Sequence, residues 1–325
     1  MPTALSETIA AQPEALERIL GLDLTEALGR LDGAERIWLV GTGTSQHAAE
    51  LGALMLRDAG RQAHWQSSAA FVRGAPALGA ADAVIVISHT TETPFARSAR
   101  RRVTAVGARL VSITGAGRDW PEAIATVPPE RSETYTASYT ATLLVLARLG
   151  VELGADGFSA GEVAALPGRV RSGIRRGEEA VLVLPERALV IAGAGPAAVT
   201  AREGALKLRE AARVLSEGYE AEYLLHGGAV PLTAADGLLL LTPGHDPDGL
   251  LPRIGAAAAQ AGLTVGALDE PASGCPLLDQ IPLTAQLQVL AARAAHARGQ
   301  DPDTVIVGPW ADQDLWAAGG PTRRG

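Results

Sequence analysis

GTGTSQHAAELGALMLRDA, residues 41–59, occurs a second time in the chain as GAGPAAVTAREGALKLREA at residues 193–211. Two further matches keep the same order: Ala81-Asp82 corresponds to Ala235-Asp236, and TATLLVL from Thr140 corresponds to TAQLQVL from Thr284. A period of about 150 residues is too long for a solenoid repeat and indicates a duplicated domain. We therefore expect two copies of one fold, each with its own hydrophobic core.

Each copy alternates short apolar runs with longer helical segments. In the first copy we expect strands at residues 37–40, 84–87 and 110–113, and helices from the GTGTS loop to Arg57, over 94–106 and over 140–149. In the second copy we expect strands at 188–192 and 238–241, and helices from about residue 200 and over 283–298. Strands that are apolar throughout are typical of parallel sheets. The predicted fold class is α/β, with two duplicated domains, each a flavodoxin-like parallel sheet with helices on both faces.

The domain boundaries are predicted from changes in composition. Residues 1–34 should form short helices, one of them opened by Pro13. We place the first α/β domain at residues 35–155 and the second at residues 181–325. Residues 156–180 are predicted as a linker that contains a helix, because Ser159 and Glu162 have the spacing of a capping box. We expect no clear element after Gln300, and a loose end to the chain.

The composition disfavours several classes of function. A net charge of −8 and an aromatic content of 4% argue against nucleic acid binding, which needs a basic face and aromatic platforms. No apolar run reaches the roughly 20 residues of a membrane span. Cys275 is the single cysteine, which fits a reducing cytoplasm, and the N-terminus does not resemble a signal peptide. No residues have the spacing of metal ligands or of a Ser/His/Asp triad, so we expect neither a metal nor a covalent hydrolase.

A hydroxyl-rich loop follows the strand at 84–87. The strand ends at Ser88, three threonines follow at 90, 91 and 93, and Pro94 stands where a helix would begin. Hydroxyl groups and the free N–H groups of a helix N-terminus together form an anion site, for which phosphate is the usual ligand; the alternative is plain helix capping. The second copy has Thr242-Pro-Gly-His-Asp-Pro247 here. Pro243 removes a donor and Asp246 repels an anion, which favours one phosphate site per chain.

The GTGTS loop at residues 41–45 could form either a dinucleotide site or a sugar site. The dinucleotide fingerprint needs a third glycine where Gln46 stands and an acidic residue after the next strand, where residues 61–65 have none. A Rossmann oxidoreductase is therefore disfavoured. Thr42, Thr44 and Ser45 could instead bind sugar hydroxyls.

The second copy carries charges where the first is apolar. Glu203, Lys207 and Glu210 are spaced i, i+4 and i+7, so they share one helix face, and Lys207 is the only lysine in the chain. The first copy has Leu51 and Met55 in place of the first two, which should pack inward. We expect a pocket in which a carboxylate beside a lysine acts as a base; the alternative is a surface salt-bridge stripe. His226 stands in an apolar setting, where a structural histidine is the common alternative.

Taken in order, these pieces resemble the sugar isomerase (SIS) domain family in its tandem form. The likeness is closest to the isomerase half of glutamine–fructose-6-phosphate aminotransferase and its stand-alone relatives, including amino-sugar phosphate deaminases. GTGTS is similar to the family's first glycine-serine loop, and SHTTET to its S-x-S-G-E-T phosphate loop. Glu130 and TYTASYTAT at 134–142 are similar to its substrate-side loop and helix, and SEGYEAEYLLHGG to the segment before its histidine-glycine pair. We expect no glutaminase domain.

The resemblance implies a role for each matching residue. Phosphate would be held by Ser88, His89, Thr90 and Thr93. The sugar would lie near Thr42, Gly43, Thr44, Ser45, Glu130 and Thr136. Glu210 would move a proton between C1 and C2, supported by Glu203 and Lys207, and His226 would assist ring opening. The resemblance also implies a homodimer, in which the neighbouring subunit lends the histidine, and no cofactor.

Two departures from the family pattern affect the predicted activity. Thr91 stands where glycine is usual, and DPDTVIVGPW at 301–310 lacks the lysine that the family places near the sugar carbonyl. A Schiff base on that residue is impossible here, whereas proton transfer by a carboxylate is not affected. We expect a cytoplasmic phosphosugar isomerase acting on a hexose or hexosamine 6-phosphate, with or without release of ammonia. The alternative is a non-catalytic phosphosugar-binding regulator, disfavoured because no helix-turn-helix segment precedes residue 41.

Overall fold

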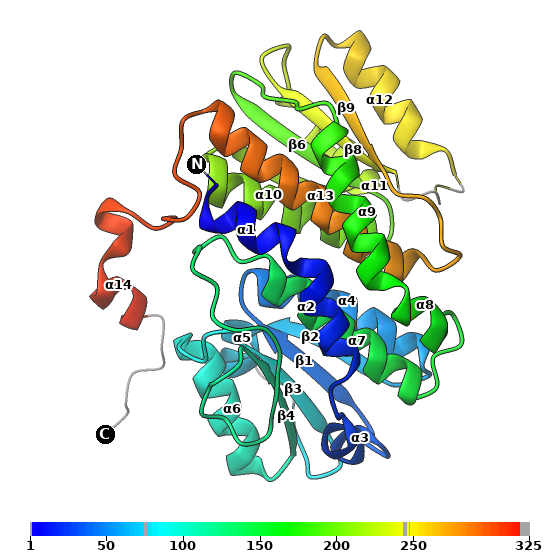
Figure 1. The fold of residues 1–325 in the computed structure, drawn as a ribbon, viewed down its shortest axis with the longest axis vertical. Helices are drawn as coiled ribbons and strands as arrows, with labels where there is room; N and C mark the ends of the chain where they lie inside the picture. Colours follow the sequence, from blue (N-terminus) through cyan, green and yellow to red (C-terminus); the bar gives the residue numbers. More distant parts are fainter. Residues whose placement is uncertain (1, 75–76, 243–245, 247, 319–325) are drawn as a thin grey trace. The chain divides into compact units, whose positions relative to one another are not determined.

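The computed structural model describes residues 2–74, 77–242, 246 and 248–318 of the chain (Figure 1). The chain divides into two compact units, each built around one parallel sheet. The first-sheet unit comprises residues 15–130 and 137–163 and the chain from Ile306 onward. The second-sheet unit comprises the chain up to Glu14 together with residues 131–136 and 164–305. The domain boundaries given above stay predictions.

Five described strands form the first sheet, in the order β2-β1-β3-β4-β5 with every neighbouring pair parallel. The strands are β1 (Ile37–Gly41), β2 (Ala63–Ser67), β3 (Ala83–Ile87), β4 (Arg109–Thr114) and β5 (Ala123–Ala125). The helices are α3 (Thr25–Leu31), α4 (Thr44–Asp58), α5 (Ser68–Arg73), α6 (Pro94–Val106), α7 (Ala137–Glu152) and α8 (Ala160–Ala164), and α2 (Gln12–Leu20) begins in the second-sheet unit.

Successive side chains of the central strands pack on opposite faces of this sheet. Val40, Val84 and Val86 form a core with residues of α5 and α6. On the other face lie α4 and α7, since a Cβ atom at Gly52 of α4 would meet both Leu39 of β1 and Leu146 of α7. These strands are therefore buried because helices pack against their apolar residues on both faces of the sheet.

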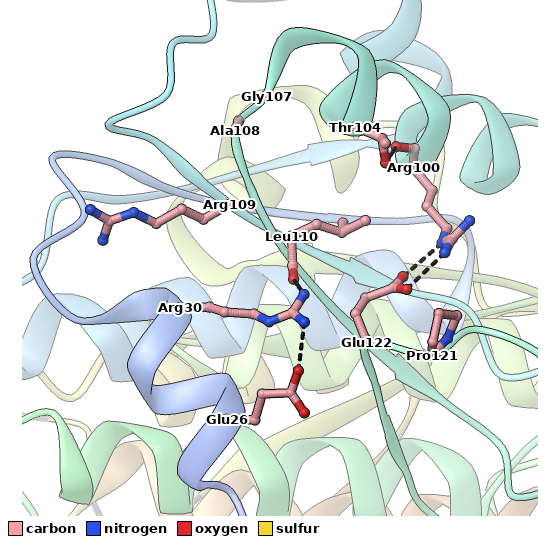
Figure 2. A pocket seen from close by; sticks show the side chains of 10 residues that line it. All are labelled: Glu26, Arg30, Arg100, Thr104, Gly107, Ala108, Arg109, Leu110, Pro121 and Glu122. Atoms are coloured by element: carbon pink, nitrogen blue, oxygen red, sulfur yellow. Dashed lines mark hydrogen bonds and ion pairs between the residues drawn. The ribbon is translucent and has the colours of Figure 1, made fainter.

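A cavity of about 560 Å³ lies at the amino edge of the first sheet, where β4 begins and α6 ends (Figure 2). Its charged groups are already paired: Arg100 donates to both oxygens of Glu122 at 2.6 and 2.7 Å, and Arg30 donates to Glu26 and to the Leu110 carbonyl. None of the predicted site residues lines it. Ligands of such sheets bind at the carboxyl edge, so this cavity is not the candidate active site.

The second sheet has the order β7-β6-β8-β9 in the described part of the chain, again with parallel neighbours. Its strands are β6 (Ala188–Gly193), β7 (Leu215–Glu220), β8 (Gly237–Thr242) and β9 (Thr264–Asp269). Its helices are α1 (Ala4–Ala10), α9 (Leu166–Glu179), α10 (Ala197–Ala212), α11 (Ala221–Tyr223), α12 (Leu250–Gln260) and α13 (Pro276–Ala297). Apolar residues of β6 and β8 pack on α1, α10 and α13 on one face and on α11 and α12 on the other.

The two sheets therefore share a topology, with β6 to β9 equivalent to β1 to β4. The equivalence also includes an ion pair at the start of the first strand of each sheet. Arg36 Nε lies 2.8 Å from Asp82, and Arg187 Nε lies 2.8 Å from Asp236. The guanidinium of Arg187 lowers the pKa of Asp236 to about 2. The predicted α/β fold of two parallel sheets with helices on both faces is confirmed.

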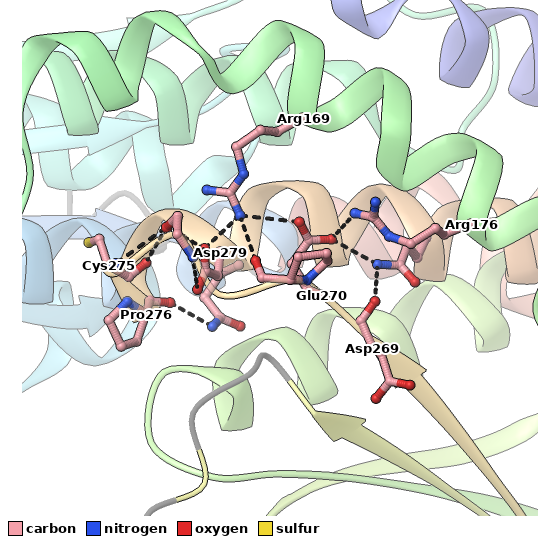
Figure 3. Close-up of polar contacts among 11 residues, drawn as sticks. Arg169, Arg176, Asp269, Glu270, Cys275, Pro276 and Asp279 are labelled. Carbon is pink, nitrogen blue, oxygen red and sulfur yellow. Dashed lines mark hydrogen bonds and ion pairs between the residues drawn. The ribbon is translucent and has the colours of Figure 1, made fainter.

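A buried ion-pair cluster fixes the turn between β9 and α13 against α9 (Figure 3). Arg169 Nη2 lies 2.6 Å from Asp279 and 3.1 Å from Glu270, and Arg176 pairs with the other oxygen of Glu270. Burial raises the pKa of Glu270 in spite of both arginines. Because α9 lies within residues 156–180, most of the predicted linker is a helix packed on α13. The capping box is present: Glu162 N donates to Ser159 Oγ at 3.3 Å and Ser159 N donates to the Glu162 carboxylate at 2.8 Å.

Every predicted strand and helix is present, but several elements were not predicted: β2, β5, β7, β9, α5 and α12. The predicted helix at 283–298 begins earlier, at Pro276, because α13 continues through Pro282. The expectation of no element after Gln300 is wrong, since a 3₁₀ turn at Gly308–Ala311 and α14 (Gln313–Ala318) follow. The predicted loose end falls on residues 319–325, which lie outside the described residues. None of the described helices is both long and apolar enough to span a membrane.

Gly173 tests the packing of α9 on α13. A Cβ atom there would lie 2.5 Å from the backbone oxygen of Pro282, so Gly173→Ala should lower the free energy of unfolding by about 1–3 kcal/mol through overpacking. Gly168 of the same helix is the control: a Cβ there meets no described atom within 4 Å, so Gly168→Ala should leave stability unchanged or slightly higher. Urea denaturation of both variants checks this, and equal effects would contradict the packing.

Candidate active site

The candidate site begins where two neighbouring strands of the first sheet end. β1 ends at Gly41 and β3 ends at Ile87, and Val40 pairs with Val86 in the sheet. The helices that follow, α4 and α6, cover opposite faces of the sheet, so the two loops separate above its carboxyl edge. This is the topological switch point at which open α/β sheets bind their ligands.

The loop after β3 has unsatisfied hydrogen-bonding capacity. Ser88 is 4% exposed, and its Oγ has no hydrogen-bond partner in the part of the chain that the structure describes. Thr93, the N-cap of α6, makes no side-chain capping bond to the described residues of that helix. Because a buried hydroxyl without a partner is costly and an uncapped N-terminus attracts negative charge, this loop suits an anion. Thr90 lies beside them and accepts a hydrogen bond from Glu92 N at 3.2 Å.

Thr91 keeps the loop in a conformation that favours glycine. Its φ is +62°, at the position where the family resemblance leads us to expect glycine. A β-branched residue in this left-handed region is a conformational outlier. Arg97 Nε donates to the Thr91 carbonyl at 2.8 Å, and Thr91 N donates to the Ser88 carbonyl at 3.3 Å. The surrounding contacts thus hold the glycine-like turn without a glycine.

Three predicted residues meet in a cavity of about 10 Å³: Thr44, Ser45 and His89. The rest of the lining includes Thr114, Thr126, Ser138, Tyr139 and Thr142. Such a volume holds roughly one water molecule, so these residues form a polar floor and not a pocket for a whole sugar. Burial lowers the pKa of His89, with the charge of Glu130 opposing this and that of Arg118 adding to it. The imidazole is therefore neutral at pH 7.

The other residues predicted to contact the substrate differ in exposure and in the unit to which they belong. Thr42 and Gly43 are exposed, and α4 begins directly after them. Glu130 accepts hydrogen bonds from Ser138 N at 2.8 Å and Ala137 N at 3.3 Å, so it caps the start of α7. Thr136 belongs to the second-sheet unit, where it is fully buried and its carbonyl accepts a bond from Gln288.

The charged face of α10 is buried in the second-sheet unit. Glu203 and Lys207 have no exposed surface, and Lys207 Nζ lies 2.5 Å from Glu210 Oε2 and 3.5 Å from Glu203 Oε1. The corresponding Leu51 and Met55 of α4 are also fully buried. The alternative of a surface salt-bridge stripe is therefore wrong. Glu210 keeps 20% of its side chain exposed, so one carboxylate of the cluster can reach a ligand.

The pKa of Glu210 is raised, first by burial and to a lesser degree by Glu203. Lys207 acts in the opposite direction through its charge and its hydrogen bond, but burial outweighs it. Lys207 thus favours the ionised carboxylate, as a base beside a lysine requires, while burial favours the neutral form. A carboxyl group whose pKa moves toward neutrality is better suited to accept and return a proton.

His226 is exposed, not buried in an apolar setting. It lies in a π-helical turn, Leu224–Gly228, whose backbone is non-helical at His226 and has φ of +116° at Gly227. The side chain is 73% exposed, with Nε2 3.8 Å from Glu222 Oε1. A structural histidine inside the core is therefore excluded.

The loop after β8 differs from the loop after β3. Pro243, Gly244, His245 and Pro247 lie outside the described residues, so the expected effect of Pro243 is not observable. The Asp246 carboxylate accepts hydrogen bonds from Leu250 N at 3.3 Å and Leu251 N at 3.1 Å. It thus occupies the N-terminus of α12, the counterpart of the end that α6 leaves uncapped. This agrees with one phosphate site per chain.

Arg118 is a charged residue at this edge that the sequence analysis missed. It follows β4, the neighbour of β3, and its Nη1 lies 3.6 Å from Glu92 Oε1 in the hydroxyl loop. Its place after a buried strand and a Gly115-Ala-Gly117 turn was the available signal. Among the described residues, no group of three or more His, Cys, Asp or Glu side chains could hold a metal ion.

Comparisons with known proteins give the family of the first copy. Residues 30–150 match the SIS domain. The chain is 28% identical over 344 residues to glutamine–fructose-6-phosphate aminotransferase [isomerizing] of Aeropyrum pernix, covering 93% of this chain and 56% of that protein. With the same enzyme of Gloeobacter violaceus it shares 29% over 308 residues, covering 83% and 50%. The chain spans about half the length of these curated relatives.

Solved structures share the fold over nearly the whole chain. Glucosamine-6-phosphate deaminase from Thermotoga maritima superposes with a TM-score of 0.80 and 19% identity, covering 93% of this chain and 97% of that one. Tagatose-6-phosphate ketose/aldose isomerase from Escherichia coli superposes with a TM-score of 0.79 and 18% identity, covering 96% and 98%. At these identities the likeness establishes the fold and leaves the substrate open.

The first copy supplies a matched test of the buried charges on α10. Lys207→Met leaves Glu203 buried without its cation and should lower the free energy of unfolding by about 3–5 kcal/mol. The double variant Glu203→Leu, Lys207→Met carries the residues of α4 and should recover most of this loss, because apolar residues can replace a buried ion pair at little cost. Chemical denaturation of both variants measures this. If Lys207→Met alone has no effect, the cluster is not buried as described.

Proposed function

Since residues 30–150 are a SIS domain, we propose that the chain is a phosphosugar isomerase that interconverts the aldose and ketose forms of a hexose or hexosamine 6-phosphate. One observation carries the proposal: the buried, unpartnered hydroxyl of Ser88 beside the uncapped N-terminus of α6. A sugar phosphate brings the dianion that such a site lacks. The names of the relatives and of the structural neighbours, which include glucosamine 6-phosphate, favour a hexosamine.

In this proposal the first-sheet unit binds the substrate. Ser88, Thr90 and Thr93 donate to the phosphate oxygens together with N–H groups of the first turn of α6. The neutral imidazole of His89 donates or accepts a hydrogen bond beside them without adding a charge. Thr42, Gly43, Thr44 and Ser45, with Glu130, contribute contacts to the sugar. Thr136, which is fully buried in the second-sheet unit, is not assigned a contact with the sugar.

The second-sheet unit supplies the proton transfer. Glu210 removes the proton from C2 of the open-chain aldose and returns it to C1, while a second proton passes from the C2 hydroxyl to the C1 oxygen, so that the reaction proceeds through an enediol intermediate. Lys207 pairs with Glu210, holds its carboxylate in place and limits the rise in its pKa, and Glu203 pairs with Lys207 from the other side. The exposed His226 assists ring opening, and we propose that the partner subunit of a homodimer provides it. No cofactor is needed for these steps.

Lys207 itself is a poor candidate for a Schiff base. It is the only lysine of the chain, it is fully buried, and its amino group is paired with two carboxylates. A Schiff base needs a neutral and accessible amine. We therefore propose isomerisation through an enediol; release of ammonia from a hexosamine would have to proceed without a lysine adduct. A non-catalytic binding regulator is the second candidate, favoured by the lysine-free segment at 301–310.

Deuterium exchange tests the proton transfer. Incubation of the protein with glucosamine 6-phosphate or a hexose 6-phosphate in D₂O should place deuterium at C2, detectable by NMR. Glu210→Gln keeps the side-chain shape but removes the base, so exchange should fall roughly 10²- to 10⁴-fold. Because the base must be ionised and burial raises its pKa, exchange should also be lost as the pH falls through a value above the usual 4.5 of glutamate.

Binding without exchange would contradict the isomerase. If the wild-type chain is stabilised by a sugar phosphate in a thermal-shift assay but incorporates no deuterium at any pH, the regulator is the correct function. If sugar phosphates cause no shift at all, both candidate functions fail.

Mixing two inactive variants tests which subunit of the proposed dimer supplies His226 to the site. Glu210→Gln and His226→Ala chains, exchanged in solution, should regain about a quarter of wild-type activity, because half the dimers are mixed and one of their two sites is intact. Subunit exchange is monitored with differently tagged chains. Complete exchange without recovery would mean that each site takes both residues from one chain.

A further inference from the structure

Arg118 and Glu92 form an ion pair at the hydroxyl loop, and the proposed function uses neither of them. Glycine 115, in the same turn, donates from its N to the His89 carbonyl at 3.0 Å, and a Cβ there would lie 2.7 Å from the His89 ring. The turn after β4 therefore packs closely against the loop after β3. This contact places the Arg118 side chain beside residues 88–93.

The guanidinium group of Arg118 has donors that its ion pair with Glu92 does not use. Its Nη1 lies 3.6 Å from Glu92 Oε1, longer than a hydrogen bond, and the Glu92 side chain is 69% exposed. Its Nε is buried and has no hydrogen-bond partner within the described ranges. A guanidinium group carries five donors in a planar fork that fits two oxygens of a phosphate. Arg118 thus retains a buried donor that its ion pair with an exposed carboxylate leaves unused.

Glu92 precedes Thr93, the N-cap of α6. Its carboxylate would repel a phosphate bound at that helix end, unless Arg118 neutralises it or the phosphate takes its place. An exposed ion pair contributes little to stability, so exchanging the carboxylate for a phosphate is inexpensive. The charge of Arg118 also lowers the pKa of His89 in this loop, after the larger effects of burial and of Glu130.

We propose that Arg118 is a second anchor for the phosphate group of the substrate, occupied by Glu92 until the phosphate binds. The inference rests on the proposed function and adds a residue that selects a phosphorylated sugar over a neutral one. Ser88 and Thr93 supply neutral donors, whereas Arg118 supplies a positive charge. Binding of a dianion then depends on ionic strength, while binding of an unphosphorylated sugar does not.

Calorimetric titrations of the full chain with glucosamine 6-phosphate, glucosamine and inorganic phosphate test the proposal. Arg118→Gln should weaken binding of the two phosphate ligands about tenfold and leave glucosamine unchanged, and Arg118→Lys should recover part of the loss. Glu92→Gln should bind the phosphate ligands as tightly as wild type or a few-fold more tightly. Arg101→Gln is the control, since it removes an equal charge from an exposed position on α6 away from the loop.

Three results would overturn the proposal. Arg118→Gln could leave phosphate binding unchanged, it could weaken glucosamine equally, or Glu92→Gln could weaken phosphate binding as much as Arg118→Gln does. The last result would make the pair a structural clamp. Thr93→Ala distinguishes failure of the Arg118 proposal from failure of the phosphate site. If Thr93→Ala weakens phosphate binding selectively while Arg118→Gln does not, the phosphate site is supported and the role of Arg118 is contradicted. If the wild-type chain binds neither phosphate ligand, both fall.

Discussion

A parallel sheet that grows outward in both directions from its first strand sends its connecting helices to opposite faces, because each crossover is right-handed. This constraint acts on both halves of the chain. In the first, α4 and α6 leave β1 and β3 on opposite faces, and in the second, α10 and α12 leave β6 and β8 in the same way. The loops between these strands and helices open above the carboxyl ends of the strands. Ser88 and Thr93 lie on such a loop, and Glu210 lies on a helix that follows one.

Within this shared frame the two copies have diverged in charge. The N-terminus of α6 lacks a side-chain cap from the described residues, whereas Asp246 occupies the N-terminus of α12. Leu51 and Met55 on α4 are replaced on α10 by Glu203 and Lys207, at the same depth of burial. Buried charges are costly, and the proposed proton transfer at Glu210 would account for charges at positions where the other half of the chain has apolar residues. The first copy is thus the natural reference for the second.

The sequence alone predicted those elements whose residue pattern results from burial on both faces of a sheet. The central strands β1, β3, β4, β6 and β8 are continuous apolar runs, and the burial of Glu203 and Lys207 followed from their apolar counterparts. Edge strands such as β2 and β7 were missed because neighbours cover them on one edge only, so polar residues such as His64 and Glu217 are tolerated there. The exposure of His226 was missed because its apolar neighbours suggested burial, while the backbone at His226 and Gly227 turns the side chain outward. The pKa of Glu210 depends on its depth of burial, which the local sequence does not give. The place of Arg118 after a buried strand and a glycine turn was a local signal, but its position beside the hydroxyl loop depends on which strands are neighbours in the sheet.

The central claim is that the first copy binds phosphate and the second does not. A crystal structure of the chain with glucosamine 6-phosphate tests it most directly. The account predicts the phosphate group within hydrogen-bonding distance of Ser88 Oγ and of the first-turn N–H groups of α6, with Asp246 still bound to the start of α12. A phosphate bound at the N-terminus of α12, or one that leaves the Ser88 hydroxyl without a partner, would contradict it.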